Sequence, residues 1–181
     1  MNQTLLEVEA KSHIPDTPQP PAPVHPRFAK AQRIAFVQAC WHREVVQEAR
    51  IAFLDEIEAR HVPRSAVDLF EVPGSFEIPL HAQILAKTRR YTAIVAAGLV
   101  VDGGIYRHEF VADAVIAALM RVQLDTEVPV ISAVLTPLRF HEHQEHRTFF
   151  LDHFVVKGAE AARACARTIE NMRSIGRAAV A

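Results

Sequence analysis

The chain has 181 residues and a formal net charge of −1 at pH 7, and half of its residues are hydrophobic. This length fits one domain with an additional tail, and the near-neutral charge argues against a nucleic-acid-binding face. No apolar run reaches the length of a membrane span, and the first residues do not resemble a secretory signal. Two cysteines are too few for a disulfide framework. We therefore expect a cytoplasmic protein that binds neither nucleic acid nor membranes.

Residues 1–30 differ in composition from the rest of the chain. They hold six of the eleven prolines and show little apolar periodicity, which favours a flexible tail. The alternative is an arm that becomes ordered against a neighbouring subunit. Residues 31–181 are then expected to form one α/β domain.

From residue 33 onward, apolar runs typical of strands alternate with segments of helical periodicity. The predicted strands cover residues 34–39, 67–72, 93–100 and 128–135. Helical patterns cover residues 45–57, 76–85, 110–122, 141–152 and 159–175. A break at residues 155–158 separates the last two of these patterns. Strands separated by helices imply a parallel sheet with right-handed crossovers. The predicted fold is therefore a single-domain parallel four-stranded sheet with helices on both faces, a flavodoxin-like three-layer sandwich.

Two predicted strands are followed directly by residues that suit a planar, hydroxylated ligand. Trp41 follows the first strand, and its ring could stack on a heterocycle or instead pack in a core or an interface. Ser75, Phe76 and Glu77 open a helix after the second strand. Free N–H groups and the Glu77 carboxylate could bind a polyol, whereas the alternative is that Ser75 and Glu77 cap the helix.

The segment Asp102-Gly103-Gly104 follows the third predicted strand and precedes a helix. Glycine N–H groups at a helix start can bind a phosphate, and Arg107 would add positive charge there. A double glycine alone is weak evidence, because many tight loops contain one.

The histidines near residue 145 are weaker candidates for a site. His141, His143, His146 and His153 do not match the spacing of a zinc-protease motif, so we expect no metal. Cys40 has no base partner nearby in the sequence and is expected to be an inert thiol.

Taken in order, the motifs of residues 33–166 resemble the 6,7-dimethyl-8-ribityllumazine synthase family. The matching segments are Ile34–Val37, Val72–Pro79, Gly98–Val101, Val128–Ile131 and Lys157–Glu160. The resemblance implies condensation of a ribitylamino-pyrimidinedione with 3,4-dihydroxy-2-butanone 4-phosphate in riboflavin biosynthesis. It implies no metal and no organic cofactor.

The resemblance also implies roles for individual residues. Trp41 would stack on the pyrimidine, and Ser75, Phe76 and Glu77 would hold the ribityl chain. Leu99, Val100 and Val101 would line the ring through their main chain, and Gly104 and Ile105 fall at the phosphate loop. Family members are built from pentamers, so Ser132, His146, Lys157 and Glu160 would come from the neighbouring subunit. We expect a homo-oligomer built from pentamers, with ten subunits favoured.

The chain departs from the family pattern at the phosphate loop. The usual Arg-Gly-Ala-Thr is replaced by Asp102–Ile105, and the proton-transferring histidine falls on Arg107. Arginine stays protonated, and on a helix His108 would point about 100° away from Arg107, so His108 could not simply take its place. A substrate phosphate or water could move the protons instead. Arg107 and His108 remain the candidate catalytic residues. Such changes resemble a divergent subtype that some bacteria carry as a second copy.

Two other functions are compatible with this pattern. The same pocket could bind riboflavin or a related flavin with little turnover, as the loss of the usual histidine and the wide ring of Trp41 suggest. The apolar helix at residues 110–122 could also make the chain an assembly scaffold.

Overall fold

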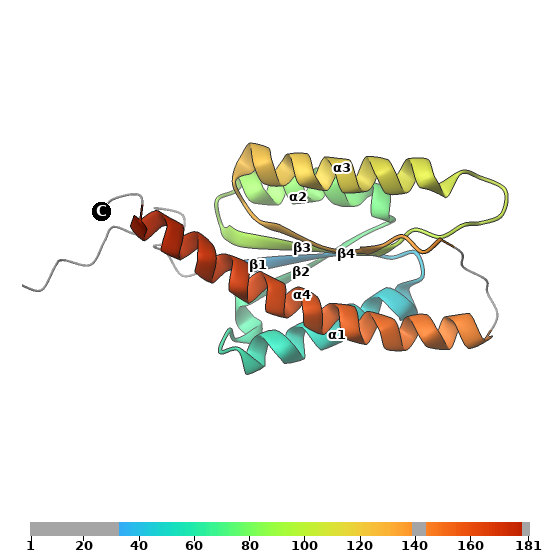
Figure 1. Ribbon diagram of the computed structural model, residues 1–181, viewed down its shortest axis with the longest axis horizontal. Coiled ribbons are helices and arrows are strands. Elements are labelled where there is room, and N and C mark those ends of the chain that lie inside the picture. The colour runs from blue at the N-terminus through green and yellow to red at the C-terminus, as the bar shows by residue number, and fades with distance from the viewer. Residues whose placement is uncertain (1–32, 139–143, 179–181) are drawn as a thin grey trace, which may run out of the picture.

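The computed structural model describes residues 33–138 and 144–178 of the chain (Figure 1). Its sheet consists of β1 (Arg33–Ala39), β2 (Val67–Val72), β3 (Tyr91–Leu99) and β4 (Val130–Leu135). The strands are ordered β2-β1-β3-β4, and each neighbouring pair is parallel. The predicted parallel four-stranded sheet is therefore confirmed.

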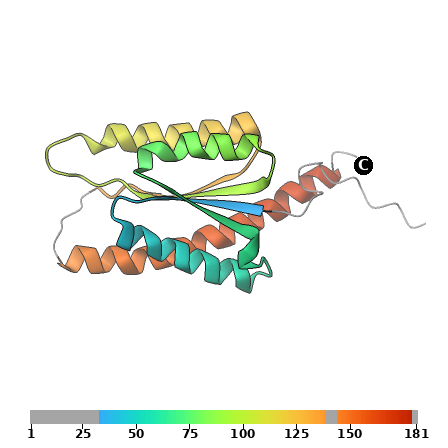
Figure 2. The same cartoon turned by 180° about the vertical axis from the view of Figure 1, so that it is seen from behind.

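Helices cover both faces of this sheet. Helices α1 (Arg43–Ala59) and α4 (Gln144–Ala178) lie on one face, and α2 (Ile78–Lys87) and α3 (His108–Thr126) lie on the other. Figure 2 shows the same three layers from behind. Two short 3-10 helices, η2 (Arg64–Ala66) and η3 (Ser75–Glu77), precede β2 and α2. The three-layer sandwich is confirmed.

Each face of the sheet has its own apolar core. Alternate side chains of β1 point to opposite faces, so Ile34 and Phe36 pack against α1 and α4, whereas Ala35 and Val37 pack against α2 and α3. Every residue of β3 is buried. A strand covered on both faces reads as a continuous apolar run, which is why the sequence predicted it clearly.

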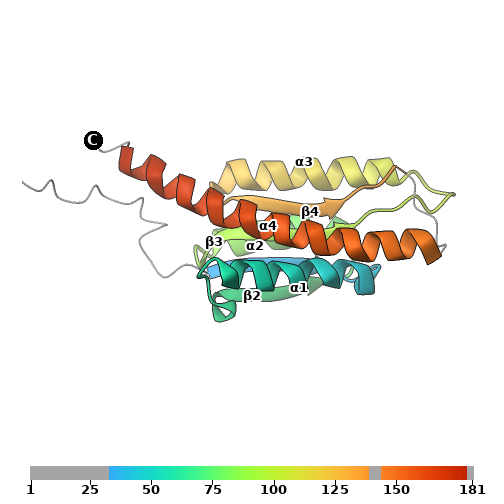
Figure 3. The ribbon, with the colours of Figure 1, turned by 60° about the horizontal axis from the view of Figure 1, so that its bottom comes forward.

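The predicted break in the last helix is wrong. Helix α4 is continuous from Gln144 to Ala178, and Figure 3 shows it passing alongside α1 and running beyond the sheet. A Cβ on Gly158 would lie 2.2 Å from the carbonyl oxygen of Ala49 in α1. Glycine here permits two helices to cross closely, and this packing offsets the roughly 1 kcal/mol that glycine costs within a helix.

Several element starts also differ from the expectation. The segment predicted as one helix over residues 76–85 begins as η3 and continues as α2, with Pro79 in the first turn of α2. Helix α3 begins at His108, four positions after Gly104. The tail at residues 1–30 and the histidines His141 and His143 lie outside the described residues.

Among the described helices, none combines the length and apolar character that crossing a membrane requires.

Candidate active site

A cavity of about 490 Å³ lies at the carboxyl ends of β1, β2 and β3. In a parallel α/β sheet, the loops at these strand ends form the usual ligand-binding crevice. The cavity is lined by Trp41, His42, Ser75, Phe76, Glu77, Leu99, Val100, Val101, Gly103, Tyr106, Arg107, His108 and Val111. It thus brings together the residues predicted at the ends of the first three strands.

Trp41 lies in the turn between β1 and α1, with 69% of its surface exposed. Its ring belongs to neither core, so the alternative that Trp41 packs in a core is wrong, whereas packing at an interface stays an alternative. The N–H of Cys40 donates to the carbonyl oxygen of Val72 at 2.8 Å, which holds the start of the turn against the end of β2.

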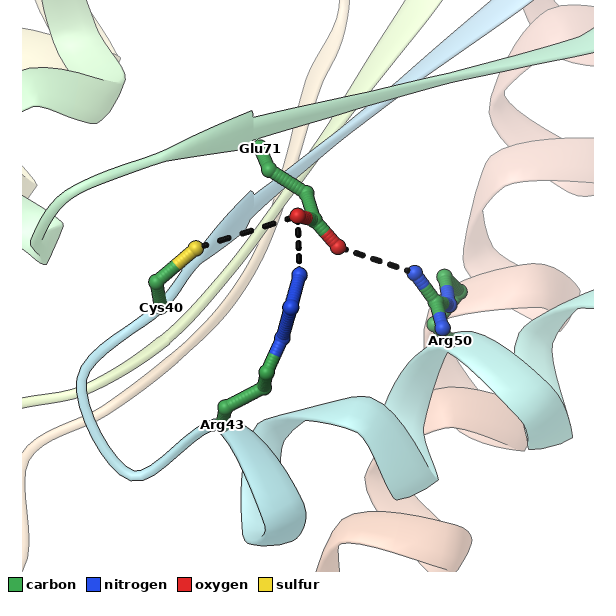
Figure 4. A network of polar contacts seen from close by, with 4 residues as sticks. All are labelled: Cys40, Arg43, Arg50 and Glu71. Atoms are coloured by element: carbon green, nitrogen blue, oxygen red, sulfur yellow. Dashed lines mark hydrogen bonds and ion pairs between the residues drawn. The ribbon is translucent and has the colours of Figure 1, made fainter.

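Side chains of Arg43 and Glu71 tie the same turn to β2. The Glu71 carboxylate binds Arg43 and, at 3.3 Å, Arg50, and lies 4.0 Å from the Cys40 sulfur (Figure 4). The hydrogen bond from Arg43 is the main reason why the pKa of Glu71 is below its usual value. This network fixes the beginning of α1 and with it the position of Trp41.

The loop after β2 places Phe76 and Glu77 at the cavity. The N–H of Gly74 donates to Oε2 of Glu77 at 2.9 Å, so Glu77 both caps η3 and lines the cavity. The alternative in which Ser75 caps this helix is wrong, because Gly74 occupies the cap position. Ser75 is buried instead, and a Cβ on Gly98 would lie 2.4 Å from its hydroxyl oxygen. Phe76 exposes 62% of its surface.

The floor of the cavity is the end of β3. The side chains of Leu99 and Val100 are buried in the two opposite cores, so their main chain is the part that remains to face a ligand. The N–H of Val100 already donates to the carbonyl oxygen of Leu135 at 2.9 Å. Val101 is half-buried and continues the same wall.

The glycine loop does not form the predicted helix-start anion site. The N–H of Gly104 donates to Oδ1 of Asp102 at 2.8 Å, and Gly104 has a φ of 74°, which glycine adopts readily. Ile105, Tyr106 and Arg107 then separate this turn from the first residue of α3. Gly103 lines the cavity, whereas Gly104 and Ile105 are exposed and do not.

Arg107 and His108 both line the cavity, contrary to the expectation from an ideal helix. Arg107 is the residue before α3, with φ −77° and ψ 89°, so the 100° helical spacing does not relate the two side chains. The Arg107 guanidinium lies 5.6 Å from the ring centre of Phe110. The His108 side chain is only 15% exposed, and its Nδ1 faces Asp102 and Glu109.

The four remaining predicted residues lie away from this cavity, on β4 and α4. Ser132 is exposed, and its hydroxyl accepts a hydrogen bond from the N–H of Val134 at 3.3 Å. Lys157 binds Glu160 at 2.8 Å, and this hydrogen bond is the main reason why the pKa of Glu160 is below its usual value. His146 is half-buried in the first turn of α4.

The segment of α4 that carries His153 borders a smaller hollow of about 300 Å³ at the end of β4. Phe149 stacks on the ring of His153 there, with the ring centres 5.3 Å apart. Within residues 33–138 and 144–178, no three metal-ligating side chains lie close enough together to hold a metal ion. Both cysteines are free thiols, and burial raises the pKa of Cys165 to about 12.

Comparison with known proteins adds to this geometry. Residues 31–173 match the 6,7-dimethyl-8-ribityllumazine synthase family. The chain is 76% identical to 6,7-dimethyl-8-ribityllumazine synthase 2 of Bradyrhizobium diazoefficiens, over 83% of this chain and 90% of that protein. The chain belongs to the 6,7-dimethyl-8-ribityllumazine synthase family.

Two other relatives agree with this family assignment. The chain is 64% identical to the 6,7-dimethyl-8-ribityllumazine synthase of Rhodococcus erythropolis, over 81% of this chain and 94% of that protein. It is 58% identical to 6,7-dimethyl-8-ribityllumazine synthase 2 of Pseudomonas syringae pv. tomato, over 98% of this chain and 95% of that protein. The number 2 in two of these names matches the expected second-copy subtype of the lumazine synthase family.

Sequence reasoning missed three residues that line the cavity of this lumazine synthase chain. His42 directly follows Trp41 and has a left-handed backbone conformation at the start of α1. Tyr106 is 85% exposed and lies between the glycine loop and Arg107. Val111 lies one helical turn after His108, a spacing that could have identified it.

Proposed function

We propose that this chain condenses 5-amino-6-(ribitylamino)pyrimidinedione with 3,4-dihydroxy-2-butanone 4-phosphate to form 6,7-dimethyl-8-ribityllumazine, a step of riboflavin biosynthesis. The observation that carries the proposal is the single cavity that gathers Trp41, Phe76, Glu77, Arg107 and His108 in a chain of this family. The cavity offers an aromatic surface, a fixed carboxylate and a guanidinium, which suit a heterocycle, a polyol and a phosphate.

The pyrimidine end of the site rests on the first and third strands. The exposed ring of Trp41 is positioned to stack on the heterocycle, and the main chain of Leu99 to Val101 is left to contact its edge. The ribityl chain would run along Ser75, Phe76 and Glu77. Because Gly74 holds Oε2 of Glu77, this carboxylate is already positioned to accept hydrogen bonds from hydroxyl groups.

The phosphate end lies at the loop that precedes α3. Arg107 is the cation of this loop and presents several N–H donors to a phosphate. The N–H of Gly104 is already used by Asp102, and Ile105 lies outside the cavity, so Gly103 and Arg107 supply the remaining loop contacts to the phosphate. The main role of the glycine loop in this proposal is thus to position Arg107, and its own N–H groups contribute less to phosphate binding.

The reaction needs orientation of two substrates more than it needs a cofactor. The amino group of the pyrimidine forms an imine with the ketone and releases water, phosphate leaves, and the ribitylamino nitrogen closes the ring with loss of a second water. Holding both substrates side by side converts a bimolecular reaction to an intramolecular one, which corresponds to effective concentrations of about 10⁵–10⁸ M. No metal and no organic cofactor enters this scheme.

A second copy of the chain completes the site in this proposal. Ser132, His146, Lys157 and Glu160 lie on β4 and α4 outside their own chain's cavity, which supports a role in the site of a neighbour. Exposed apolar side chains of α3, namely Ile116, Met120 and Leu124, are available for packing between copies. We therefore include a homo-oligomer built from pentamers, with ten subunits, and a cytoplasmic location, which the free thiols favour.

Steady-state formation of the lumazine from both purified substrates, measured by absorbance, tests this function. The proposal expects turnover above the uncatalysed reaction that saturates with each substrate. Turnover at the uncatalysed rate, together with submicromolar binding of riboflavin, would contradict it and favour the flavin-binding alternative. The wide, exposed ring of Trp41 is the observation that keeps this alternative in the test.

A further inference from the structure

The cavity contains an arginine where the proposed reaction needs a group that takes up and releases a proton. Formation of the imine, loss of phosphate and ring closure each move protons between carbon, nitrogen and oxygen. Arginine remains protonated in proteins and is a poor acid or base. The carrier of these protons is therefore either another side chain of the cavity or, as the alternative, a substrate phosphate or water.

His108 is placed for this task by the start of α3. Because Arg107 precedes the helix and His108 is its first residue, both side chains reach the cavity wall. Arg107 is exposed, with its guanidinium 5.6 Å from the ring centre of Phe110. His108 is far less exposed, which limits the competition of bulk water for its ring nitrogens.

Two carboxylates face one nitrogen of the His108 ring. Nδ1 lies 3.9 Å from Oδ1 of Asp102 and 3.6 Å from Oε2 of Glu109. The Glu109 side chain is 70% exposed, whereas the same oxygen of Asp102 is anchored by the N–H of Gly104. Asp102 is therefore the more rigid of the two partners.

A carboxylate beside Nδ1 determines which nitrogen carries the proton of a neutral histidine. With the N–H at Nδ1 directed toward Asp102, the lone pair is on Nε2, at the opposite side of the ring. Distances of 3.6 to 3.9 Å are longer than a hydrogen bond, but such contacts commonly shorten when substrate binds.

We infer that His108 is the proton-transferring residue of this site and that Asp102 is a positioning residue that acts through His108. The inference rests on the proposed function and goes beyond it, because the corresponding position of the family pattern is Arg107. Arg107 then binds the phosphate, and the next residue moves the protons.

The elimination of phosphate shows what His108 does in this scheme. Nε2 takes the proton from C3 of the imine, the C3–H electron pair forms a C3=C4 double bond, and the C4–O bond breaks as phosphate leaves. The protonated His108 then returns the proton to C4, which becomes a methyl group, while the enol hydroxyl at C3 loses its proton to water and becomes a ketone. The ribitylamino nitrogen attacks this ketone and the ring closes with loss of water.

Replacement of His108 tests the first half of the inference. His108→Ala should lower kcat by about 10²-fold or more and change the KM of each substrate by less than about threefold. Added imidazole should restore part of kcat in His108→Ala and should not do so in Arg107→Ala. The matched control is His61→Asn, in an exposed loop at the other end of the sheet, where asparagine tolerates the positive φ.

Two replacements of Asp102 test the second half. Asn keeps an oxygen that can accept from the N–H of Gly104, so Asp102→Asn removes the charge and keeps the turn. It should lower kcat by about 10-fold, and Asp102→Glu should restore part of this loss. In a His108→Ala background, Asp102→Asn should leave kcat unchanged, because Asp102 acts through His108.

The outcomes separate this inference from the function on which it rests. Absence of turnover in the unsubstituted protein would overturn both. Normal turnover together with a kcat of His108→Ala within twofold of the unsubstituted protein would overturn the inference alone. A decrease without imidazole rescue, or an additional loss in the double variant, would also overturn it.

Discussion

At the scale of single residues, close approaches at two glycines shape the site. A Cβ on Gly98 would collide with the buried hydroxyl of Ser75, and a Cβ on Gly74 would lie 3.1 Å from the Glu77 carboxylate. Glycine at position 98 lets the loop after β2 lie against β3, and glycine at position 74 leaves space for the Glu77 carboxylate and the Trp41 ring. The positions of the proposed ribityl-binding residues thus depend on neighbouring residues that have no side chain.

Arg107→Ala should raise the KM of the phosphate-bearing substrate more than the KM of the pyrimidine. Loss of a guanidinium that binds phosphate removes a charge-assisted hydrogen bond worth about 1.5–3 kcal/mol, roughly a 10- to 150-fold change. Steady-state kinetics with each substrate varied in turn measures this difference. Arg121→Ala, at an exposed position of the same helix, is the control. An unchanged KM for the phosphate substrate would contradict the role of Arg107.

Gln38 gives a prediction about stability at the same scale. Its side chain on β1 is 1% exposed, and neither of its polar atoms has a hydrogen-bond partner within the described residues. Gln38→Leu, similar in volume, should raise the free energy of unfolding by about 1–3 kcal/mol. Urea unfolding measures this, with Gln38→Ala as the control that loses volume. A lower stability of Gln38→Leu would mean that this amide is satisfied, for example by a buried water.

At the scale of elements, the close crossing of α1 and α4 determines how these two helices cover their face of the sheet. Gly158 lies against the backbone of Ala49, and the two helices together bury Phe53 and Phe154. The same helix carries His146, Lys157 and Glu160, so the crossing also determines where these side chains are presented. A shift of α4 would move them all.

Gly158→Ala should therefore destabilise the protein, although the same change usually stabilises a helix. The added methyl has no space at 2.2 Å from the Ala49 oxygen, and such overpacking costs about 1–3 kcal/mol. Thermal unfolding at constant protein concentration measures the change, with Ala164→Ser at an exposed position of α4 as the control. An unchanged or higher Tm would contradict the close crossing.

The sequence predicted the elements better than it predicted their junctions. Continuous apolar runs predicted the central strands β1 and β3, because strands buried on both faces need such runs. The edge strand β2 was also predicted, although it carries Asp68 and Glu71 and is only partly buried. The break at Gly158 was wrong because that glycine serves a contact with Ala49, a residue far away in the sequence. The prediction that the side chains of Arg107 and His108 point in different directions was wrong, because Arg107 lies before the first residue of α3. Loop geometry of this kind is set by tertiary packing and leaves little trace in residue periodicity.

At the scale of the whole molecule, the amino ends of the strands are joined by an ion pair network opposite the cavity. Asp68 of β2 accepts hydrogen bonds from Nε of Arg33 in β1 at 2.8 Å and from the hydroxyl of Tyr91 in β3 at 2.9 Å. The bond from Arg33 is the main reason why the pKa of Asp68 lies below its usual value, whereas burial acts in the opposite direction. Three strands thus share one carboxylate.

This network makes stability depend on pH in acid. A carboxyl group whose pKa is lower in the folded than in the unfolded protein stabilises the fold above its unfolded pKa. That stabilisation is lost as the pH falls through the lowered pKa of folded Asp68. We expect the free energy of unfolding to decrease below about pH 4, and Asp68→Asn to flatten this decrease. Urea unfolding from pH 7 to pH 3 measures it, with Asp125→Asn on the surface of α3 as the control. An equal slope in both variants would contradict the role of Asp68.

The central claim is that the pyrimidine binds in the cavity at the ends of β1, β2 and β3. Trp41 is the only tryptophan of the chain and lines this cavity, so its fluorescence reports on the site alone. The most direct measurement is a fluorescence titration with the ribitylamino-pyrimidinedione in the absence of oxygen, with ribitol as the control ligand. The account predicts a saturable change with one equivalent bound per chain, at concentrations near the KM of that substrate. Saturable turnover with no change in Trp41 fluorescence over the same concentrations would contradict it.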